Sequence, residues 1–465
     1  MSAAAQLRDY QQDGVHWIVR QFRDHKAVLL ADEAGLGKTL EALTAAQKLA
    51  AENILIVCPA GARRVWLQEI ERWVPDWLPR VILAEPGTNL SELQTRLSAG
   101  SEPMILILGY DELSKGRNPF IACLHRHWDL LVLDEAHYLK NPSNRTQAVY
   151  GSRGSAEGIH AAAAKVLLLT GTPTPNHAGE LWQHYRALWP DALGKPLTLT
   201  QFEERFTRYK DTVFGRQVVG SKNQAVLREA LGPMVLRRRK DEVLAELPPL
   251  ILQDVPLSPV SLADRGLSFD ARMAESLLSW ADIDEELLKG LRQPEVQIAT
   301  LRRELGEAKV KPTILWVQER LQSTHKILLF AWHHSVIAHL AKGLTEFNPV
   351  VITGETSPKA RAEGIYAFQH DSWKRVFIGQ VLAAGTAITL TAANEVAIVE
   401  PSWVPGENVQ AICRAHRLGQ RDSVLASFLY LPGTLDKRIM QVFRRKAGEI
   451  AELQGEGEWK VAESA

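Results

Sequence analysis

A glycine-rich segment near the start of the chain limits its possible folds more than any other feature. It reads Gly35-Leu36-Gly37-Lys38-Thr39, it follows an apolar run at Val28 to Ala31, and a predicted helix begins near Thr39. In this context backbone N–H groups can close around phosphate oxygens, and the helix N-terminus adds positive potential. We expect Lys38 to reach the β and γ phosphates of ATP and Thr39 to ligate Mg²⁺. The alternative is an ordinary loop, and the strict pattern has glycine where this chain has Asp32.

A pair of carboxylates forms the second part of the candidate site. The apolar run Leu130 to Leu133 leads into Asp134-Glu135-Ala136-His137. Carboxylates at the carboxyl end of a buried parallel strand lie at the ligand-binding edge of the sheet. We therefore expect Asp134 to hold the magnesium shell and Glu135 to orient and deprotonate the attacking water. Without a phosphate loop upstream, the same pair would be interpreted as a solvated turn.

The next apolar run ends in a turn with two hydroxyl groups. Val166 to Leu169 is followed by Thr170-Gly171-Thr172-Pro173. Glycine and proline are ordinary turn residues, so the segment alone indicates only a turn. Beside a nucleotide, however, the hydroxyls of Thr170 and Thr172 could sense the γ phosphate and couple its presence to movement.

Two arginines in the C-terminal part are candidates for completing the site. Arg414 and Arg417 lie three residues apart, which places them on one face of a helix if the segment is helical. The planar fork of arginine binds phosphate oxygens bidentately, and an arginine donated by a separate lobe would couple closure to hydrolysis. A solvated basic face is the alternative for two arginines considered alone.

Apolar runs recur in both halves of the chain and define the fold class. Runs that are apolar throughout are typical of strands buried on both faces, and amphipathic segments between them indicate helices, so the order predicts parallel, doubly wound sheets. At about 150 residues per domain, the 465 residues suggest two or three domains. The expected strands are Ala27 to Ala31, Ile54 to Cys58, Met104 to Leu108, Leu130 to Leu133 and Val166 to Leu169, then Ile327 to Ala331, Val350 to Thr353, Val376 to Gly379, Val396 to Val399 and Leu425 to Tyr430.

The region between the two sets of strands, roughly 175 to 310, is predicted to be mainly helical. Apolar residues recur there every three or four positions, as in Leu277 to Leu291. Pro248-Pro249 marks a natural joint, and we interpret the run Arg237 to Lys240 as a helix face that leads to it rather than as a grip on phosphates.

Composition excludes several classes of protein. The 54 Lys and Arg residues balance the 54 Asp and Glu residues, so any nucleic-acid surface must be local. The three cysteines, Cys58, Cys123 and Cys413, are widely spaced, which argues against a disulfide framework or a zinc site. Neither a leader pattern nor an apolar run of 18 residues is present, so we expect an untargeted cytoplasmic protein without a membrane segment.

The ordered series of motifs resembles the SWI/SNF-type branch of the superfamily 2 helicase-like ATPases, in a DEAH-box form. The segment Asp32 to Thr39 is close to that branch's DEMGLGKT, whose aspartate accounts for Asp32, and the segment Met234 to Val243 resembles the branch's signature before the lobe junction. The motifs that carry the resemblance are Tyr10-Gln11, GLGKT, DEAH, LTGTP, LLFAW and QAICRAHRLGQ.

The resemblance implies two RecA-like lobes joined through helical protrusions. We expect an ATP-binding lobe over 1–240 with a protrusion at about 175–235, a hinge and second protrusion over 241–310, a helicase lobe over 311–451 and a polar tail over 452–465. Family members with large additional modules are longer, so this chain resembles a bare, monomeric motor. A partner protein for targeting, or a prokaryotic or viral setting, is expected.

The resemblance also assigns roles to individual residues. It implies that Gln11 contacts adenine, that Gly35, Gly37, Lys38 and Thr39 bind phosphate and magnesium, that Asp134 and Glu135 carry out hydrolysis, and that Arg414 and Arg417 are arginine fingers. His137, Thr170, Thr172 and Gly385 would couple hydrolysis to movement. Backbone contacts to duplex DNA are expected near Arg63, Arg64, Tyr110, Trp332 and Thr386.

One departure from the family lies at the coupling turn of the second lobe. The family usually has a Gly-x-Gly-Leu turn, and this chain has Ala387 at the second glycine position. Alanine disfavours a positive φ. Three functions are therefore open: a duplex-DNA translocase, a nucleotide-switched DNA-binding module, and a helicase that separates strands of DNA or RNA.

Overall fold

The two halves of the chain fold into two compact units. The computed structural model describes residues 7–85, 88, 90–99, 102–114, 126–152, 158–174, 177–212, 215–258, 294–381, 388–402, 405–432, 434, 436 and 440. The first unit comprises Met1–Thr174, Ala178–Phe206 and Lys222–Ala245, and the second comprises Pro175–His177, Thr207–Ser221 and Glu246–Ala465. Both units are RecA-like lobes, as the resemblance implied, and both are built on parallel sheets, as the alternation of apolar runs and amphipathic segments predicted.

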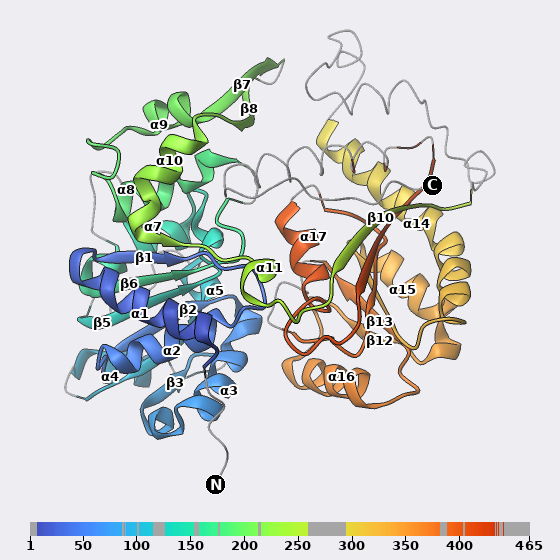
Figure 1. Ribbon diagram of the computed structural model, residues 1–465, viewed down its shortest axis with the longest axis horizontal. Coiled ribbons are helices and arrows are strands. Elements are labelled where there is room, and N and C mark those ends of the chain that lie inside the picture. The colour runs from blue at the N-terminus through green and yellow to red at the C-terminus, as the bar shows by residue number, and fades with distance from the viewer. Residues whose placement is uncertain are drawn as a thin grey trace. The chain divides into compact units, whose positions relative to one another are not determined.

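The first unit has a seven-stranded parallel sheet in the order β3-β4-β2-β5-β6-β1-β9 (Figure 1). All five runs expected to be strands in this half are strands. The strands are β1 (Ala27–Leu30), β2 (Ile54–Cys58), β3 (Val81–Leu83), β4 (Ile105–Gly109), β5 (Trp128–Asp134), β6 (Ala163–Leu169) and β9 (Val235–Leu236). The helices are α1 (Asp9–Asp24), α2 (Lys38–Lys48), α3 (Arg63–Trp73), α4 (Leu90–Ala99), α5 (Tyr110–Ser114), α7 (Asn144–Tyr150), α8 (Trp182–Leu188), α9 (Leu199–Phe206), α10 (Gln224–Leu231) and α11 (Lys240–Val243).

The register of the three central strands positions the site. In β6, Leu169 pairs with Leu30 of β1 on one side and with Asp134 of β5 on the other. The three strands therefore end at the same edge of the sheet, and the segments that follow them meet there. Helices α1, α2 and α3 pack on one face, where Val15, Ala42 and Trp66 join the core. Burial of the opposite face as well explains why these strands are apolar throughout.

The second unit repeats this architecture with six parallel strands in the order β10-β15-β14-β11-β13-β12. In β11, Leu328 and Phe330 face one core and Ile327 and Leu329 face the other. The first core includes side chains of α16 and α17, and the second includes side chains of α14 and α15. The elements are β10 (Leu250–Pro256), α14 (Pro294–Arg320), β11 (Ile327–Ala331), α15 (His334–Gly343), β12 (Val350–Ile352), α16 (Pro358–His370), β13 (Val376–Gln380), β14 (Glu395–Ile398), α17 (Pro405–Ile412) and β15 (Val424–Tyr430).

The prediction that residues 175 to 310 are mainly helical is wrong for four segments. Strands β7 (Thr207–Thr212) and β8 (Gly215–Ser221) form an antiparallel hairpin. Strand β9 joins the first sheet beside β1, and β10, which lies within the expected hinge and protrusion, pairs with β15 along its whole length. These strands are short or carry polar residues, and the partners of β9 and β10 are distant in sequence, so periodicity alone could not identify them. The expected helix at Leu277 to Leu291 lies outside the described residues.

Two further outcomes concern the hinge and the membrane. The run Arg237 to Lys240 is not a helix face, because helix begins only at Lys240 and β9 ends at Leu236. Within the described part of the chain, no helix has both the length and the apolar character needed to cross a membrane.

Candidate functional site

The glycine loop adopts a backbone that only glycine accommodates easily. Gly35 and Gly37 have φ angles of 97° and 90°. A Cβ atom at Gly37 would also lie 2.4 Å from the side-chain nitrogen of Gln11. The side chains of Tyr10 and Gln11 donate hydrogen bonds of 2.9 and 3.0 Å to the carbonyl oxygen of Leu36. Helix α1 therefore holds the loop in its folded form, and the Gln11 amide expected to contact adenine is bonded to the loop itself.

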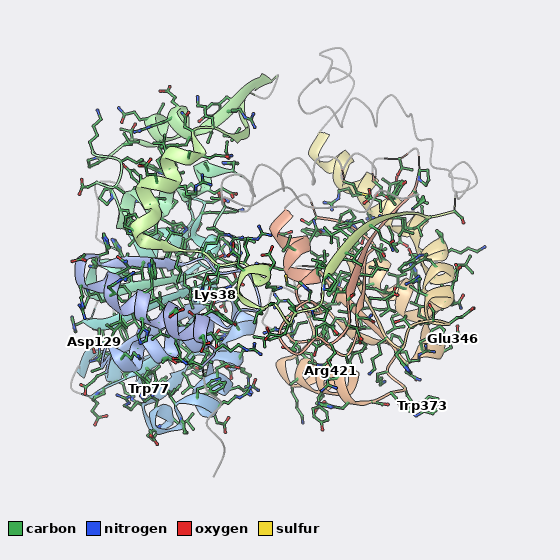
Figure 2. All side chains as sticks on the ribbon, viewed as in Figure 1. Lys38, Trp77, Asp129, Glu346, Trp373 and Arg421 are labelled. Atoms are coloured by element: carbon green, nitrogen blue, oxygen red, sulfur yellow. The ribbon has the colours of Figure 1, made fainter. Side chains whose placement is uncertain are left out.

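Lys38, which Figure 2 labels, is the first residue of α2 and follows the glycine loop after β1. Its ammonium group donates hydrogen bonds to the carbonyl oxygens of Asp32 (2.6 Å) and Glu33 (3.3 Å). Burial lowers the pKa of Lys38, and the charges of Glu135, Asp32 and Asp134 oppose that shift. An anion beside the ammonium would stabilise its positive charge in place of the solvent that burial removes. Lys38 is therefore suited to binding a phosphate group.

The start of α2 also fits an anion. Gly37 is the N-cap and no side chain caps the helix there. The unpaired N–H groups of a first turn carry positive potential, so a phosphate group can take the place of a cap. This arrangement fits the triphosphate of ATP.

Asp134 is the last residue of β5, and Glu135 follows it at the same edge of the sheet. The indole nitrogen of Trp66 donates a 2.8 Å hydrogen bond to Oδ2 of Asp134, and the backbone N–H of Glu135 donates to Oδ1 at 3.0 Å. Burial, and next the charge of Glu135, raises the pKa of Asp134 to about 6. Among the described residues, Glu135 is one of four non-glycine residues with a positive φ, at 49°, a conformation that is uncommon and often found at functional sites.

The donors fit a magnesium ion shared with a phosphate. Among the described residues, no group of three or more His, Cys, Asp or Glu side chains gathers as a self-sufficient metal site. Mg²⁺ is commonly bound by one or two carboxylates together with substrate phosphates. Asp134 and the hydroxyl of Thr39 would be the protein ligands of such an ion.

The residues expected to couple hydrolysis to movement are in contact. His137 Nδ1 lies 3.0 Å from the Thr170 hydroxyl and 3.3 Å from Oε2 of Glu135. The Thr170 hydroxyl donates to the same Glu135 oxygen at 3.5 Å and accepts from the backbone N–H of Thr172 at 3.1 Å. A change in the position or charge of the Glu135 carboxylate would therefore directly affect the segment after β6. Gly385, the fourth residue expected to take part, lies outside the described residues.

The arginines of the second unit are not on a helix, contrary to the expectation of a shared helix face. Helix α17 ends at Ile412, and Arg414 and Arg417 lie in the turns that follow. The Arg414 side chain is buried, and its backbone carbonyl accepts a hydrogen bond from the N–H of Leu390. Arg417 donates to the carbonyl oxygen of Ile388 at 3.1 Å. The side chains are therefore set by turn geometry, which the spacing of three could not indicate.

The residues expected to contact DNA are divided by their exposure. Arg63 and Tyr110 are 6% and 1% exposed, so neither side chain is open to a DNA phosphate. Arg64 is exposed and pairs with Glu85 at 2.7 Å. In the second unit Trp332 is partly buried beneath the guanidinium of Arg302, and Thr386 lies outside the described residues.

Two residues beside the site were missed by sequence interpretation. Trp66 donates a hydrogen bond to Asp134, and nothing in its sequence position indicates that bond. Arg238 forms ion pairs with Asp32 and Glu41, both fully buried. A charged residue at position 32, directly after an apolar strand, was the available signal that a buried partner was needed.

Comparison with known proteins places these features in a family. The model of the SNF2-related domain matches residues 10–261, and that of the helicase conserved C-terminal domain matches residues 309–419. The chain is 31% identical over 453 residues to the "DNA annealing helicase and endonuclease ZRANB3" of Bos taurus, covering 95% of this chain and 40% of that protein.

More distant similarities extend over the same part of the chain. The "SWI/SNF-related matrix-associated actin-dependent regulator of chromatin subfamily A-like protein 1" of Xenopus tropicalis is 28% identical over 449 residues, covering 95% of this chain and 44% of that protein. A solved "Sulfolobus solfataricus SWI2/SNF2 ATPase core in complex with dsDNA" is 24% identical with a TM-score of 0.44, covering 97% of this chain and 94% of that one. The chain thus spans less than half the length of these curated relatives.

Proposed function

Because the chain belongs to the SNF2-related family of helicase-like P-loop ATPases, we propose that it hydrolyses ATP to ADP and phosphate when DNA is bound and moves along duplex DNA. Such movement would remodel or reanneal the duplex or displace bound proteins. The observation that best supports this proposal is the convergence of Lys38, Asp134 and Glu135 at one sheet edge, with Glu135 connected to His137 and Thr170. A site built only to bind nucleotide would not need a carboxylate linked to the segment after β6.

In this proposal each residue acts on a definite part of the reaction. Lys38 binds the β and γ phosphates, the N–H groups at the start of α2 bind the same oxygens, and Glu135 orients the attacking water and accepts its proton. Thr39 and Asp134 hold Mg²⁺, which neutralises charge on the phosphates when it is bound. Gln11 contacts adenine, and Arg414 and Arg417 act as arginine fingers.

Coupling and DNA binding complete the proposal. His137, Thr170, Thr172 and Gly385 pass the state of the γ phosphate to the rest of the motor, and Arg64, Trp332 and Thr386 contact the DNA backbone. Backbone contacts position a protein on DNA without reading its sequence. We further propose a DEAH-type motor that is monomeric, acts with a targeting partner protein and works in the cytoplasm. The curated relatives named above come from animals, so a prokaryotic or viral setting stays a prediction.

The first experiment is steady-state ATP hydrolysis by the full chain at low ionic strength. The arms are no nucleic acid, single-stranded DNA, duplex DNA, forked DNA and duplex RNA, each with Glu135→Gln as the blank. Low salt is needed because each phosphate contact weakens as salt displaces it. Strong stimulation by duplex DNA, followed by displacement of a triplex-forming strand, is the result expected of a translocase.

The other outcomes identify the alternatives. Strand separation on forked DNA or on duplex RNA would identify a helicase instead. ATP binding with hydrolysis that no nucleic acid stimulates would favour a nucleotide-switched binding module. Turnover by Glu135→Gln equal to that of the unchanged protein would contradict the assignment of Glu135 as the general base.

A further inference from the structure

Arg238 is enclosed by two buried carboxylates beside the phosphate loop. Its Nε donates to both oxygens of Asp32, at 3.1 and 3.0 Å, and its Nη2 contacts both oxygens of Glu41, at 2.9 and 2.7 Å. Its Nη1 donates to the carbonyl oxygen of Tyr10, and its guanidinium carbon lies 5.2 Å from the centre of the Tyr10 ring. One arginine therefore joins α1, the end of β1 and α2.

The cluster leaves little room for a different cation. The side chains of Asp32 and Glu41 are 0% exposed. A Cβ atom at Gly14 would lie 1.9 Å from Oε2 of Glu41, so α1 closes directly over the cluster. The planar fork of arginine can bond two carboxylates at once, whereas the single ammonium of lysine cannot reproduce that geometry. Removal of the Arg238 guanidinium would leave two buried carboxylates incompletely paired, which would lower the free energy of unfolding.

The backbone around Arg238 is bonded to the start of the phosphate loop. The N–H of Arg238 donates to Oδ1 of Asp32 at 3.0 Å, and the N–H of Glu33 donates to the carbonyl oxygen of Arg238 at 3.1 Å. Two residues further, the N–H of Lys240 donates to Oε2 of Glu33 at 2.9 Å. Asp32 and Glu33 are the residues whose carbonyl oxygens hold the Lys38 ammonium.

These contacts form a short chain from Arg238 to the phosphate-binding lysine. Arg238 fixes Asp32 and its segment fixes Glu33, and these two residues in turn position Lys38. The same segment leads along the chain to Glu246, where the continuous C-terminal part of the second unit begins. The loop that would bind phosphate and the start of the connection between the units are therefore one hydrogen-bonded structure.

We propose that Arg238 is a positioning residue for ATP, and that nucleotide in the phosphate loop stabilises the Leu236 to Lys240 segment that leads into the second unit. This inference rests on the proposed function of the loop. It assigns to Arg238 no contact with ATP, since its effect passes through Asp32, Glu33 and Lys38. By linkage, if nucleotide stabilises the bonded conformation of this segment, then stabilising that conformation raises the affinity for nucleotide by the same factor.

The test compares two adjacent Arg→Lys changes in the full chain. Arg238→Lys keeps the charge and removes the fork, and Arg239→Lys makes the same change at a more exposed arginine that pairs with Asp241. Binding of a fluorescent ATP analogue with Mg²⁺ should weaken about tenfold or more in Arg238→Lys, the effect of losing one charge-assisted hydrogen bond, and should be unchanged in Arg239→Lys. In steady-state hydrolysis, Arg238→Lys should raise KM for ATP by a larger factor than it lowers kcat.

Hydrogen exchange supplies a measurement that a purely structural role would not change. In the unchanged protein, the ATP analogue should slow exchange of the Arg238 and Lys240 amides, which donate to Asp32 and Glu33. This measurement needs no variant, so the inference remains testable even if Arg238→Lys fails to fold. In a folded Arg238→Lys protein, the protection by nucleotide should be reduced.

The outcomes separate this inference from the proposed function. If the unchanged protein binds no ATP analogue, the proposed ATP site is wrong and the inference fails with it. If it binds the analogue but exchange of the Arg238 and Lys240 amides is unaffected, the link to the segment is wrong and the ATP site stands. Equal affinity in a folded Arg238→Lys protein would overturn the positioning role in the same way.

Discussion

The indole nitrogen of Trp66 lies 2.8 Å from Oδ2 of Asp134, so a helix on one face of the sheet orients the carboxylate expected to hold magnesium. Trp66 is 1% exposed and fixed in the core. A buried donor of this kind limits the rotation of the carboxylate and selects the oxygen that is left for a metal.

Trp66→Phe should therefore raise the Mg²⁺ concentration needed for half-maximal ATP hydrolysis by about tenfold, the scale of losing a bond that orients a metal ligand. Titration of ATPase activity with Mg²⁺ measures this. Trp77→Phe is the matched control, because Trp77 is also buried in the first unit. An equal effect in both variants would show general loss of packing rather than a role at Asp134.

Thr170 and Thr172 offer a paired test of coupling. Thr170→Val removes the hydroxyl that contacts both His137 and Glu135, whereas Thr172→Val preserves the backbone N–H through which Thr172 joins the network. We expect Thr170→Val to reduce the stimulation of hydrolysis by duplex DNA more than Thr172→Val does, with ATP affinity preserved in both. Stimulation ratios measured at saturating DNA give the result. Equal ratios in the two variants would remove the Thr170 hydroxyl from the coupling role.

Arg64 is the candidate DNA contact of the first unit that is exposed. Its side chain is 59% exposed, so its ion pair with Glu85 contributes little stability and is easily exchanged for a phosphate contact. Arg64→Ala should weaken duplex-DNA binding and reduce the slope of log affinity against log salt by about one. Arg72→Ala, on the same helix, controls for net charge. An equal loss in both variants would mean that α3 acts only through its overall charge.

His184 should make the first unit sensitive to acid. Its ring is hydrogen-bonded to the Tyr150 hydroxyl at 2.7 Å, and burial, followed by the charge of His137, lowers its pKa from 6.5 to about 3. Between these two pH values the unfolded chain binds a proton at this position and the folded chain does not, so stability falls as the pH falls below about 6.5. The loss is on the order of a few kcal/mol at most.

Calorimetric melting of the full chain between pH 5 and pH 8 measures this dependence. His184→Gln should melt at a lower temperature than the unchanged protein at pH 7.5 and should lose less stability on acidification. A pH dependence of melting that is the same in both proteins would contradict the assignment to His184.

The second unit contains a buried ion pair between α14 and the segment after β15. The ammonium of Lys309 lies 3.0 Å from the carboxylate of Asp436, and their side chains are 1% and 4% exposed. Lys309→Met should destabilise this unit by about 3–5 kcal/mol, because it leaves a buried carboxylate without its partner. Lys359→Met removes the exposed partner of Glu363 and should change stability by less than about 0.5 kcal/mol. Denaturant unfolding measures both, and similar values would contradict the argument from burial.

The central strands and the phosphate loop were predictable because their signals are local. Ten apolar runs were expected to be strands and all ten are strands, since a strand covered on both faces must be apolar along its whole length. Strand β10 gave no such signal, because Gln253 and Asp254 interrupt it and its partner β15 lies far along the chain.

The residues of the candidate site likewise fall into those that local sequence indicates and those that only long-range contacts reveal. Lys38, Asp134 and Glu135 could be proposed from the sequence because each follows or opens an element whose type the sequence indicates. Trp66 and Arg238 were missed, because each contributes through a contact with residues far away in the chain, 68 positions for Trp66 and Asp134 and 206 for Arg238 and Asp32.

The sequence by itself therefore determined the class of fold, the glycine loop and the position of the two carboxylates after β5, since glycine conformation and strand burial impose residue types at fixed positions. The tertiary structure alone decided which donors orient those groups, that Arg63 is buried while Arg64 is exposed, and that Arg414 and Arg417 lie in turns. The physical reason is that hydrogen bonds and burial depend on which distant segments come into contact. The spacing of residues along one element does not indicate those long-range contacts.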